Sequence, residues 1–397
     1  MKKILYLVSH AQLGGAQRYI LDLAKNLKNK YEITVAYGIQ DNKDDISSRL
    51  EHEQIARSVI PNFKKPIGFI SDIKAYFKIK KLLLELKPDI IHLCGFKASF
   101  LGSMAAKNIS KTFSPKIIYT AHGWAFNRFE NFLKRKYYFF VEKYTAEYKN
   151  KIICTNKIDA ETAVSELKIN EKKIKLINNG LDIKQYGFLP KEDAKKKLFS
   201  KISNARLPDE KTILIGSIGN LNRDKGYYYL IKALHYLIID YGYPITAIII
   251  GDGPEKNDLE QRIIKFHPMD YSAMSGEVSN KIILAGRISD APELLPAFDF
   301  YVSTSLKEGF PYTILEAMGA GLPIIATKTG SVPNMITDGV NGMLIESRDS
   351  AKLAKVISNL IKDEALKKKI SDNAKHDASH LFKFNKTLQE TKTLYEN

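Results

Sequence analysis

The chain alternates short apolar runs with amphipathic, helix-length segments, and it does so twice. The first half carries the runs KILYLV, EITVAYG, DIIHLC, KIIYTAH and KIICTN. The second half restarts with KTILIGSIG, PITAIIIGDG, KIILAGR, DFYVSTS and LPIIAT, with helices expected at 225–241, 255–266, 311–320 and 349–376. Such alternation predicts parallel sheets covered by helices. The 397 residues therefore predict an α/β protein of two doubly wound, Rossmann-like domains whose ligand-binding strand ends face a central cleft.

The boundary between the two domains is expected near residue 187. Residues 181–211 lack strand periodicity and are rich in Lys and Pro, which is typical of a linker followed by an entry helix. The predicted organisation is an N-terminal domain over 1–187, a C-terminal domain over 188–379, and a last helix over 380–397 without a strand partner. No apolar run approaches the roughly 20 residues that cross a bilayer, and the apolar start is too short for a secretion signal. A cytosolic location is expected.

Positive charge is concentrated in the first half of the chain. Residues 1–190 hold 33 Lys and Arg against 18 Asp and Glu, a net charge of +15, whereas the remainder holds 28 against 26. Such a bias favours a polyanionic partner. The segments 70–87 and 132–144 mix cationic and large apolar residues at helical spacing. In the ordinary interpretation, the apolar side of each helix packs in the core and a basic face is solvated.

The hypothesis drawn from this charge is peripheral association with an anionic membrane surface, at the inner face of the cell membrane. Nucleic acid is the competing polyanion, but the sequence contains no nucleic-acid recognition motif. We therefore expect a membrane partner and no nucleic acid.

The segment KEGFPYTILEAMGAG carries the densest chemical information. Glu308 and Glu316, with seven residues between them, bracket a Gly-Phe-Pro turn. Pro311 suits the first position of a helix, and the amides of residues 312–314 would then lie unpaired at its positive end, as an anion site suited to a diphosphate. Glu316 could bind a neutral diol beside the phosphates, and Glu308 a group on the other side. The segment could therefore hold a nucleotide sugar at its ribose, diphosphate and sugar.

The alternative is an amphipathic helix whose glutamates are simply solvated, which is the usual place of charged residues. Leu315, Ala317 and Met318 make the helix apolar on most sides, and GLPIIAT follows as a buried parallel strand. A glutamate inside such a buried unit needs a partner, and a bound ligand can be that partner.

The stretch EGFPYTILEAMGAGLPIIATKTGS closely resembles the donor-binding signature of the retaining glycosyltransferases of family 4, which have the GT-B fold. The resemblance implies transfer of a hexosyl or N-acetylhexosaminyl group from a nucleotide diphosphate sugar, with UDP expected, to a lipid-linked or polysaccharide acceptor in cell-surface glycan synthesis. It also implies that the last helix crosses back to the N-terminal domain.

The resemblance assigns roles to this segment. Glu308 would hold sugar hydroxyls and support positive charge near the anomeric carbon, and Glu316 would bind the ribose. The remaining donor-binding positions are Gly309, Phe310, Thr313, Ile314 and Leu315.

A second loop, GNLNRDKG, follows the expected strand TILIGSI. The family usually has Gly-Arg-Leu and then Lys-Gly, and the arginine and lysine hold the diphosphate of the donor. Lys225 matches, whereas Asn220 stands where arginine is typical, and Arg223 could supply the missing cation. Such cations would stabilise the leaving diphosphate. The alternative for Lys225 is an ordinary surface lysine.

The N-terminal domain offers two candidate segments. Gly14 and Gly15, between the first strand and the first helix, would let the backbone approach the donor. His122, at the carboxyl end of the strand KIIY, corresponds to a family histidine that contacts the transferred sugar, although a lone histidine is more often structural. Trp124 and Phe126 could form an apolar wall for the substrate or belong to the core.

The last candidate binding residues follow the expected strand KIILAG. The cofactor expectation rests on a motif that the sequence lacks. In relatives the loop LAGRIS meets the nucleobase, so Arg287 and Ile288 are candidates. No Asp-x-Asp occurs, so the usual metal–diphosphate clamp of the other large glycosyltransferase fold is missing. We therefore expect no metal and no other cofactor. Two alternatives stay open: a GT-B sugar-nucleotide epimerase or hydrolase, and a catalytically silent GT-B subunit, which Asn220 would permit.

Overall fold

The computed structural model describes residues 1–39, 46–63, 68–127, 131–203, 207–265 and 280–397. The chain forms two compact units, Met1–Asn179 with Asn385–Asn397, and Gly180–Phe384. The division lies before the predicted boundary near residue 187, because Leu181 pairs with Lys383 and its side chain reaches Gly319, both in the second unit. The last helix belongs to the first unit, where the Thr387 hydroxyl donates to the Asn178 carbonyl at 2.7 Å.

The first unit contains a seven-stranded sheet in the order β3-β2-β1-β4-β5-β6-β7, and every pairing is parallel. The strands are β1 (Lys3–Val8), β2 (Glu32–Gly38), β3 (Ala56–Ile60), β4 (Ile90–Cys94), β5 (Lys116–Ala121), β6 (Lys151–Cys154) and β7 (Ile174–Leu176). The apolar runs of the first half are thus strands, and β4 is buried along its whole length because helices cover both faces.

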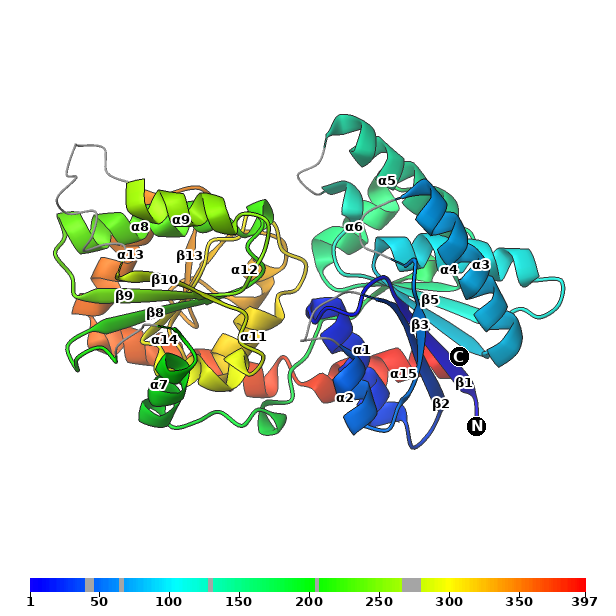
Figure 1. Cartoon of the computed structure of the whole chain (residues 1–397), viewed down its shortest axis with the longest axis horizontal. Coiled ribbons are helices and arrows are strands. Elements are labelled where there is room, and N and C mark those ends of the chain that lie inside the picture. The colour runs from blue at the N-terminus through cyan, green and yellow to red at the C-terminus, as the bar shows by residue number, and fades with distance from the viewer. Residues whose placement is uncertain (40–45, 64–67, 128–130, 204–206, 266–279) are drawn as a thin grey trace. The chain divides into compact units, whose positions relative to one another are not determined.

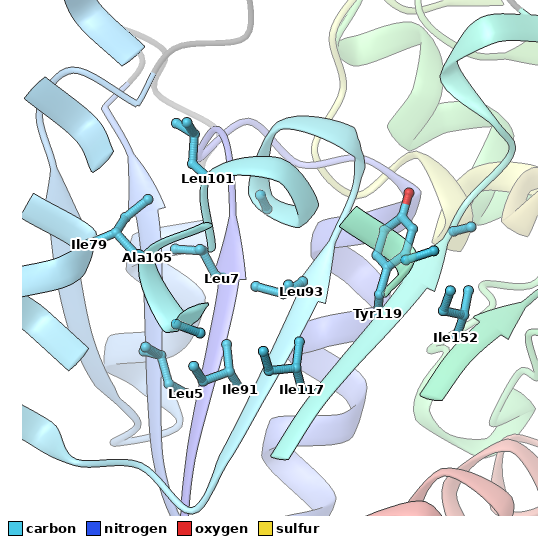
Figure 2. Close-up of a cluster of buried hydrophobic side chains, with 14 of the residues drawn as sticks. Leu5, Leu7, Ile79, Ile91, Leu93, Leu101, Ala105, Ile117, Tyr119 and Ile152 are labelled. Carbon is cyan, nitrogen blue, oxygen red and sulfur yellow. The ribbon is translucent and has the colours of Figure 1, made fainter. Parts of the chain in front are cut away.

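Helices lie on both faces of this sheet (Figure 1). One layer holds α1 (Gly15–Leu27), α2 (Ile46–His52) and α15 (Phe384–Glu396), and the other α3 (Phe69–Leu86), α4 (Phe96–Ile109) and α5 (Phe132–Ala146), with α6 (Lys157–Ser165) after β6. Figure 2 shows the core under the second layer, where strand residues such as Leu5, Ile91 and Leu93 meet Ile79 of α3 and Leu101 of α4.

The helices α3 and α5 pack less of their apolar surface than the sequence predicted. Only Ala75, Ile79 and Leu83 are buried on α3, and on α5 the buried residues are Glu142, Thr145 and Ala146. Large apolar side chains on both helices are exposed instead, namely Phe69, Ile70, Ile73, Phe77, Leu84, Phe132, Leu133, Tyr137, Phe140 and Tyr144. The expectation that the apolar sides of these helices pack in the core is therefore wrong for most of these residues.

The second unit has a six-stranded parallel sheet in the order β10-β9-β8-β11-β12-β13. The strands are β8 (Ile213–Ile218), β9 (Ile245–Ile250), β10 (Ile282–Gly286), β11 (Phe300–Ser303), β12 (Ile324–Thr327) and β13 (Met343–Ile345). The helices are α7 (Lys191–Ser200), α8 (Tyr227–His235), α9 (Lys256–Lys265), α11 (Tyr312–Gly319), α12 (Val332–Met335), α13 (Ser350–Lys362) and α14 (Glu364–His380).

In the second unit, the structure has two helices, α13 and α14, where the sequence predicted one. The expected helix over 349–376 breaks at Asp363, whose backbone leaves the helical region at φ −116° and ψ 80°. The Asp363 side chain accepts a hydrogen bond from the Leu366 amide, so it caps α14.

Candidate functional site

The helix α11 starts with an open first turn. Pro311 is its N-cap, with φ −72° and ψ 118°, and no side chain caps the helix. The helix therefore begins at Tyr312, one residue after the predicted start. The Pro311 carbonyl accepts from the Leu315 amide at 3.4 Å, while the amides of Thr313 and Ile314 precede any acceptor within the helix. These amides and the helix dipole favour an anion at this end.

Next to this helix end, Lys225 and Glu308 form an ion pair. The Lys225 Nζ lies 2.6 Å from Glu308 Oε1, and the Ser305 hydroxyl donates to the same oxygen at 2.6 Å. The side chains of Lys225 and Glu308 are 22% and 9% exposed, so both groups are reachable and largely shielded from water. The structure thus brings together two residues that the sequence proposed separately.

Backbone contacts fix the short turn Arg223–Lys225 against the loop before α11 that carries Glu308, called the Glu308 loop below. The Asp224 carbonyl accepts from the amide of Leu306 at 2.7 Å, and the Thr304 hydroxyl donates to the Lys225 carbonyl at 3.2 Å. Gly226 has φ +62°, and a Cβ there would lie 2.3 Å from the Thr304 carbonyl oxygen. Only glycine fits this close approach, so the ion pair is held by the fold on the Lys225 side.

The Glu308 loop is also held from the segment after β12. Gly330 has φ +54°, and a Cβ at this position would lie 1.9 Å from the Glu308 carbonyl oxygen. The Ser331 amide donates to the Gly309 carbonyl at 3.1 Å. The Glu308 backbone is therefore packed on two sides, which aims its carboxylate reproducibly.

Glu316 is buried within α11 and is 4% exposed. Its Oε1 accepts from the Tyr186 hydroxyl at 3.0 Å, and the Tyr186 ring stacks on Phe188 at 5.3 Å between centroids. A polar partner for this buried glutamate was expected, but Tyr186 was not predicted because it lies 130 residues away in sequence. Ser305 was likewise missed, although its position three residues before Glu308 could have suggested it.

The remaining predicted donor-site residues differ in their surroundings. Asn220 and Arg223 are exposed, and Arg223 opens the short turn Arg223–Lys225. Ile314 and Leu315 are fully buried, so only their backbone atoms can meet a ligand.

Arg287 and Ile288 directly follow β10, with Arg287 exposed and Ile288 half-buried, as a loop at the carboxyl end of that strand requires. Phe310 is buried and packs edge-on against Phe382.

Three predicted site residues lie in the first unit. His122 directly follows β5, and its ring lies edge-on to Tyr19 with centroids 5.2 Å apart. Within the described residues, its buried Nε2 has no hydrogen-bond partner, and burial lowers the pKa of His122 to about 4. A neutral ring with an unused nitrogen suits contact with a sugar hydroxyl. Gly14 caps α1 in an extended conformation, and Gly15 is its first residue.

Trp124 and Phe126 belong to the core rather than to a substrate wall. They are 1% and 4% exposed, and their rings stack at 5.9 Å. The Trp124 indole donates to the Asp159 carbonyl at 2.8 Å, which satisfies its only polar group.

The described residues contain neither a metal-binding cluster nor a membrane-spanning helix. In these parts of the chain, no three His, Cys, Asp or Glu side chains gather closely enough to hold a metal ion. No helix there combines the length and apolar composition that a membrane crossing needs. Cys94 and Cys154 are buried free thiols.

Family models match both halves of the chain. "Glycosyltransferase Family 4" matches residues 13–185, and "Glycosyl transferases group 1" matches residues 199–377. The chain is 27% identical over 395 residues to the UDP-Gal:alpha-D-GlcNAc-diphosphoundecaprenol alpha-1,3-galactosyltransferase of Escherichia coli, covering 98% of this chain and 96% of that protein.

Two further proteins are similar over most of their length. The N,N'-diacetylbacillosaminyl-diphospho-undecaprenol alpha-1,3-N-acetylgalactosaminyltransferase of Campylobacter jejuni is 25% identical, over 77% of this chain and 76% of that protein. The structure of Anabaena HepE in complex with UDP and glucose superposes with a TM-score of 0.81 at 24% identity, over 100% of both chains. Together with the two parallel-sheet units, these matches establish the fold. The chain belongs to the group 1 glycosyltransferases and has the GT-B fold.

Proposed function

We propose that this protein is a retaining glycosyltransferase that moves a hexosyl or N-acetylhexosaminyl group from a UDP-sugar to a lipid-linked or polysaccharide acceptor. The observation that carries the proposal is the Lys225–Glu308 ion pair, held by backbone contacts beside the open first turn of α11. It sets a cation, a carboxylate and helix amides next to one another, as a sugar diphosphate requires.

Each group then has a separate task. The amides of Thr313 and Ile314, with Lys225 and the exposed Arg223, would stabilise the diphosphate as its bond to the anomeric carbon breaks. Glu308 would support the positive charge that develops on the sugar. Both of its contacts use Oε1, so Oε2 can accept from a sugar hydroxyl. Glu316 would bind the ribose, with Tyr186 orienting its carboxylate.

In the proposed reaction, an acceptor hydroxyl attacks from the face that the diphosphate leaves. The new bond joins the acceptor oxygen to the anomeric carbon, the bond from that carbon to the phosphate oxygen breaks, and the hydroxyl proton passes to the departing diphosphate. Glu308 forms no covalent bond, and His122 contacts the transferred sugar. Because Lys225, Arg223 and helix amides can balance the diphosphate charge, we propose that no divalent cation is required.

The similar proteins support the donor and acceptor classes. The names of the Escherichia coli and Campylobacter jejuni relatives describe alpha-linked transfer to undecaprenol-linked diphosphosugars, and Anabaena HepE was solved with UDP and glucose. A lipid-carried acceptor would hold the enzyme at the inner face of the membrane, in the synthesis of cell-surface polysaccharide.

The first experiment is a thermal-shift panel of UDP-, GDP- and ADP-sugars, with and without EDTA. A ligand at 100 times its Kd stabilises the protein by about 2.7 kcal/mol, so the melting temperature should rise selectively with UDP-sugars and stay raised in EDTA. Glu316→Ala should raise the Kd of the UDP-sugar about 10- to 100-fold. The substitution removes a hydrogen bond from the ribose to a charged acceptor, which is worth about 1.5–3 kcal/mol. The control is Glu346→Ala, which removes an exposed glutamate paired with Lys328 at 3.0 Å.

The outcomes separate the remaining functions. No response to any nucleotide sugar would favour a catalytically silent subunit, and a response that EDTA abolishes would contradict the metal-free site. If UDP is released with water alone and no acceptor is glycosylated, the enzyme is a hydrolase or an epimerase. The anomeric configuration of a transferred product, measured by NMR, tests retention.

A further inference from the structure

The helix α3 has two apolar faces, and only one of them packs in the protein. Ala75, Ile79 and Leu83 form the buried face. On the opposite side, Ile70 is 68% exposed and Phe77 is 60% exposed, with Ile73 and Leu84 on the same stripe at helical spacing. Large apolar side chains left in water over several turns indicate that this face meets a partner.

The helix α5 repeats the pattern. Its exposed stripe follows helical spacing and consists of Leu133, Tyr137, Phe140 and Tyr144, of which Leu133 is 76% and Phe140 is 63% exposed. Phe132, at the first position of the helix, is 67% exposed. We call the exposed faces of these two helices the α3/α5 surface. It consists of Phe69, Ile70, Ile73, Lys74, Phe77, Lys78, Lys81, Leu84, Glu85, Phe132, Leu133, Lys134, Arg135, Lys136, Tyr137, Phe140, Lys143 and Tyr144.

The charges of this surface are almost all positive. The only carboxylate of α5, Glu142, is 1% exposed and lies 3.4 Å from the buried Lys149 ammonium. On α3, Asp72 is paired with Lys97 at 2.5 Å, and Glu85 lies 3.6 Å from Lys81. The exposed lysines and arginine therefore face the solvent with little competing negative charge, interleaved with aromatic and aliphatic side chains.

The two helices lie in one layer with α4, on the same side of the sheet (Figure 1). Phe96, at the start of α4, contacts the rings of Tyr137 and Tyr138 on α5, and Lys97 binds Asp72 on α3. Both helices start at the end of the sheet where the parallel strands finish. Their most exposed apolar residues are therefore near the end at which such sheets bind ligands.

We propose that the α3/α5 surface docks on an anionic phospholipid bilayer. Its aromatic and aliphatic side chains enter the headgroup region while the lysines bind lipid phosphates, which is the residue mixture that interfacial helices use. Nucleic acid fits less well, because Ile70, Ile73 and Leu133 cannot stack on bases. A second copy of the chain would place one basic surface against the other in a twofold dimer. This inference depends on the surface alone and not on the proposed donor site.

Sedimentation with vesicles, without any sugar nucleotide, tests the proposal. We expect binding to vesicles of phosphatidylcholine with one-third phosphatidylglycerol, weaker binding at high salt, and little binding to phosphatidylcholine alone. Lys74→Gln/Lys136→Gln/Lys143→Gln should weaken partitioning about 100-fold. The matched control is Lys196→Gln/Lys352→Gln/Lys355→Gln, which removes three exposed lysines of the second unit and should leave binding unchanged.

The apolar part is tested in the same assay. Phe77→Ser/Leu133→Ser/Phe140→Ser should lower partitioning at least about tenfold. Its control is Ile264→Ser/Val340→Ser/Leu381→Ser, which removes apolar residues of comparable exposure from the second unit. Because all six residues are exposed, the melting temperatures should stay near that of the wild type. In Phe140→Trp, the fluorescence emission of the introduced tryptophan should shift to the blue when anionic vesicles are added. The buried Trp124 contributes a constant background. In Leu381→Trp, the emission should not shift.

Three results would overturn the proposal. The first is the absence of binding to anionic vesicles at low salt, and the second is equal binding to charged and uncharged vesicles. The third is full binding by both α3/α5 variants, which would place the contact elsewhere. Binding of RNA without binding of vesicles would assign the surface to nucleic acid. A dimer that the apolar variant dissociates, in a protein that ignores vesicles, would assign it to a second copy.

Discussion

Two polar clusters differ in their access to solvent. The polar cluster beneath α15 in the first unit is closed to solvent, and it consists of Tyr6, His92, Thr120 and Tyr395. The Glu308 cluster in the second unit is open, and it consists of Lys225, Ser305 and Glu308. Beneath α15, the Tyr395 hydroxyl lies 2.5 Å from His92 Nδ1 and 3.1 Å from the Tyr6 hydroxyl. His92 Nε2 lies 2.7 Å from the Thr120 hydroxyl. Tyr6, His92 and Thr120 are completely buried, and Tyr395 is 1% exposed. Each ring nitrogen of His92 has a partner, so the cluster offers nothing to a ligand.

The Glu308 cluster has the opposite character. Lys225 keeps 22% of its side chain exposed, and the Lys225–Glu308 pair lies beside a helix end that no side chain caps. The difference shows what separates a structural polar cluster from a binding site. A closed network fixes the position of a helix, while an open one keeps charge accessible for a substrate. The two clusters should therefore respond in opposite ways to mutation.

The largest expected effect is that of Glu308→Gln on transfer. The amide keeps an oxygen for Lys225 and Ser305, so stability should change by only about 1 kcal/mol. Loss of the negative charge should lower kcat about 10²- to 10³-fold, because that charge is proposed to act in the transition state. The measurement is initial-rate kinetics with the UDP-sugar that the thermal-shift panel selects.

Glu346→Gln is the control for this experiment, since Glu346 forms an exposed ion pair with Lys328. Wild-type kcat in Glu308→Gln, together with a large loss of stability, would make the Glu308 cluster structural and remove the contrast between the two units.

The second effect is that of Tyr395→Phe on stability. The substitution leaves His92 Nδ1 and the Tyr6 hydroxyl buried without this partner, which should cost about 1–3 kcal/mol. The shift of melting temperature on adding the UDP-sugar should stay that of the wild type. Tyr241→Phe, at a residue that is 49% exposed, is the control and should be neutral. Unchanged stability in Tyr395→Phe would mean that the closed network does not hold α15.

The sequence predicted the fold and the core of the candidate site for physical reasons. The repeated strand–helix pattern follows from local periodicity, and it gave both parallel sheets. The Glu308 loop and α11 lie in one short segment, so their order along the chain already placed the glutamate beside a helix start. The pairing of Lys225 with Glu308 required the sheet, because the two residues are 83 positions apart.

Other features could not be predicted because they depend on tertiary contacts. Tyr186 reaches Glu316 from 130 residues away, and His92 reaches Tyr395 across 303. Periodicity showed that α3 and α5 have apolar faces, but it could not show that much of their apolar surface would be left uncovered. Trp124 illustrates the same limit, since an aromatic residue after a strand end can belong to a site or to the core.

The smallest expected effect is a loss of stability at low pH, which arises from His92 in the polar cluster beneath α15. Burial lowers the pKa of His92 to about 3, while an unfolded histidine titrates near 6.5. The unfolded state therefore binds more protons below pH 6.5, so the contribution of His92 to stability is complete above that pH and is lost as the pH falls toward 3. At pH 5.5 the expected loss is about 1 kcal/mol.

Urea unfolding of the wild type and of His92→Gln between pH 7.5 and 5 measures this loss. The variant should be less stable than the wild type at neutral pH, and its stability should fall less steeply with acid. His52→Gln, at an exposed position on α2, is the matched control and should keep the wild-type slope. Equal slopes for all three proteins would mean that His92 can be protonated in the folded state. The polar cluster beneath α15 would then be less closed than its burial and hydrogen bonds indicate.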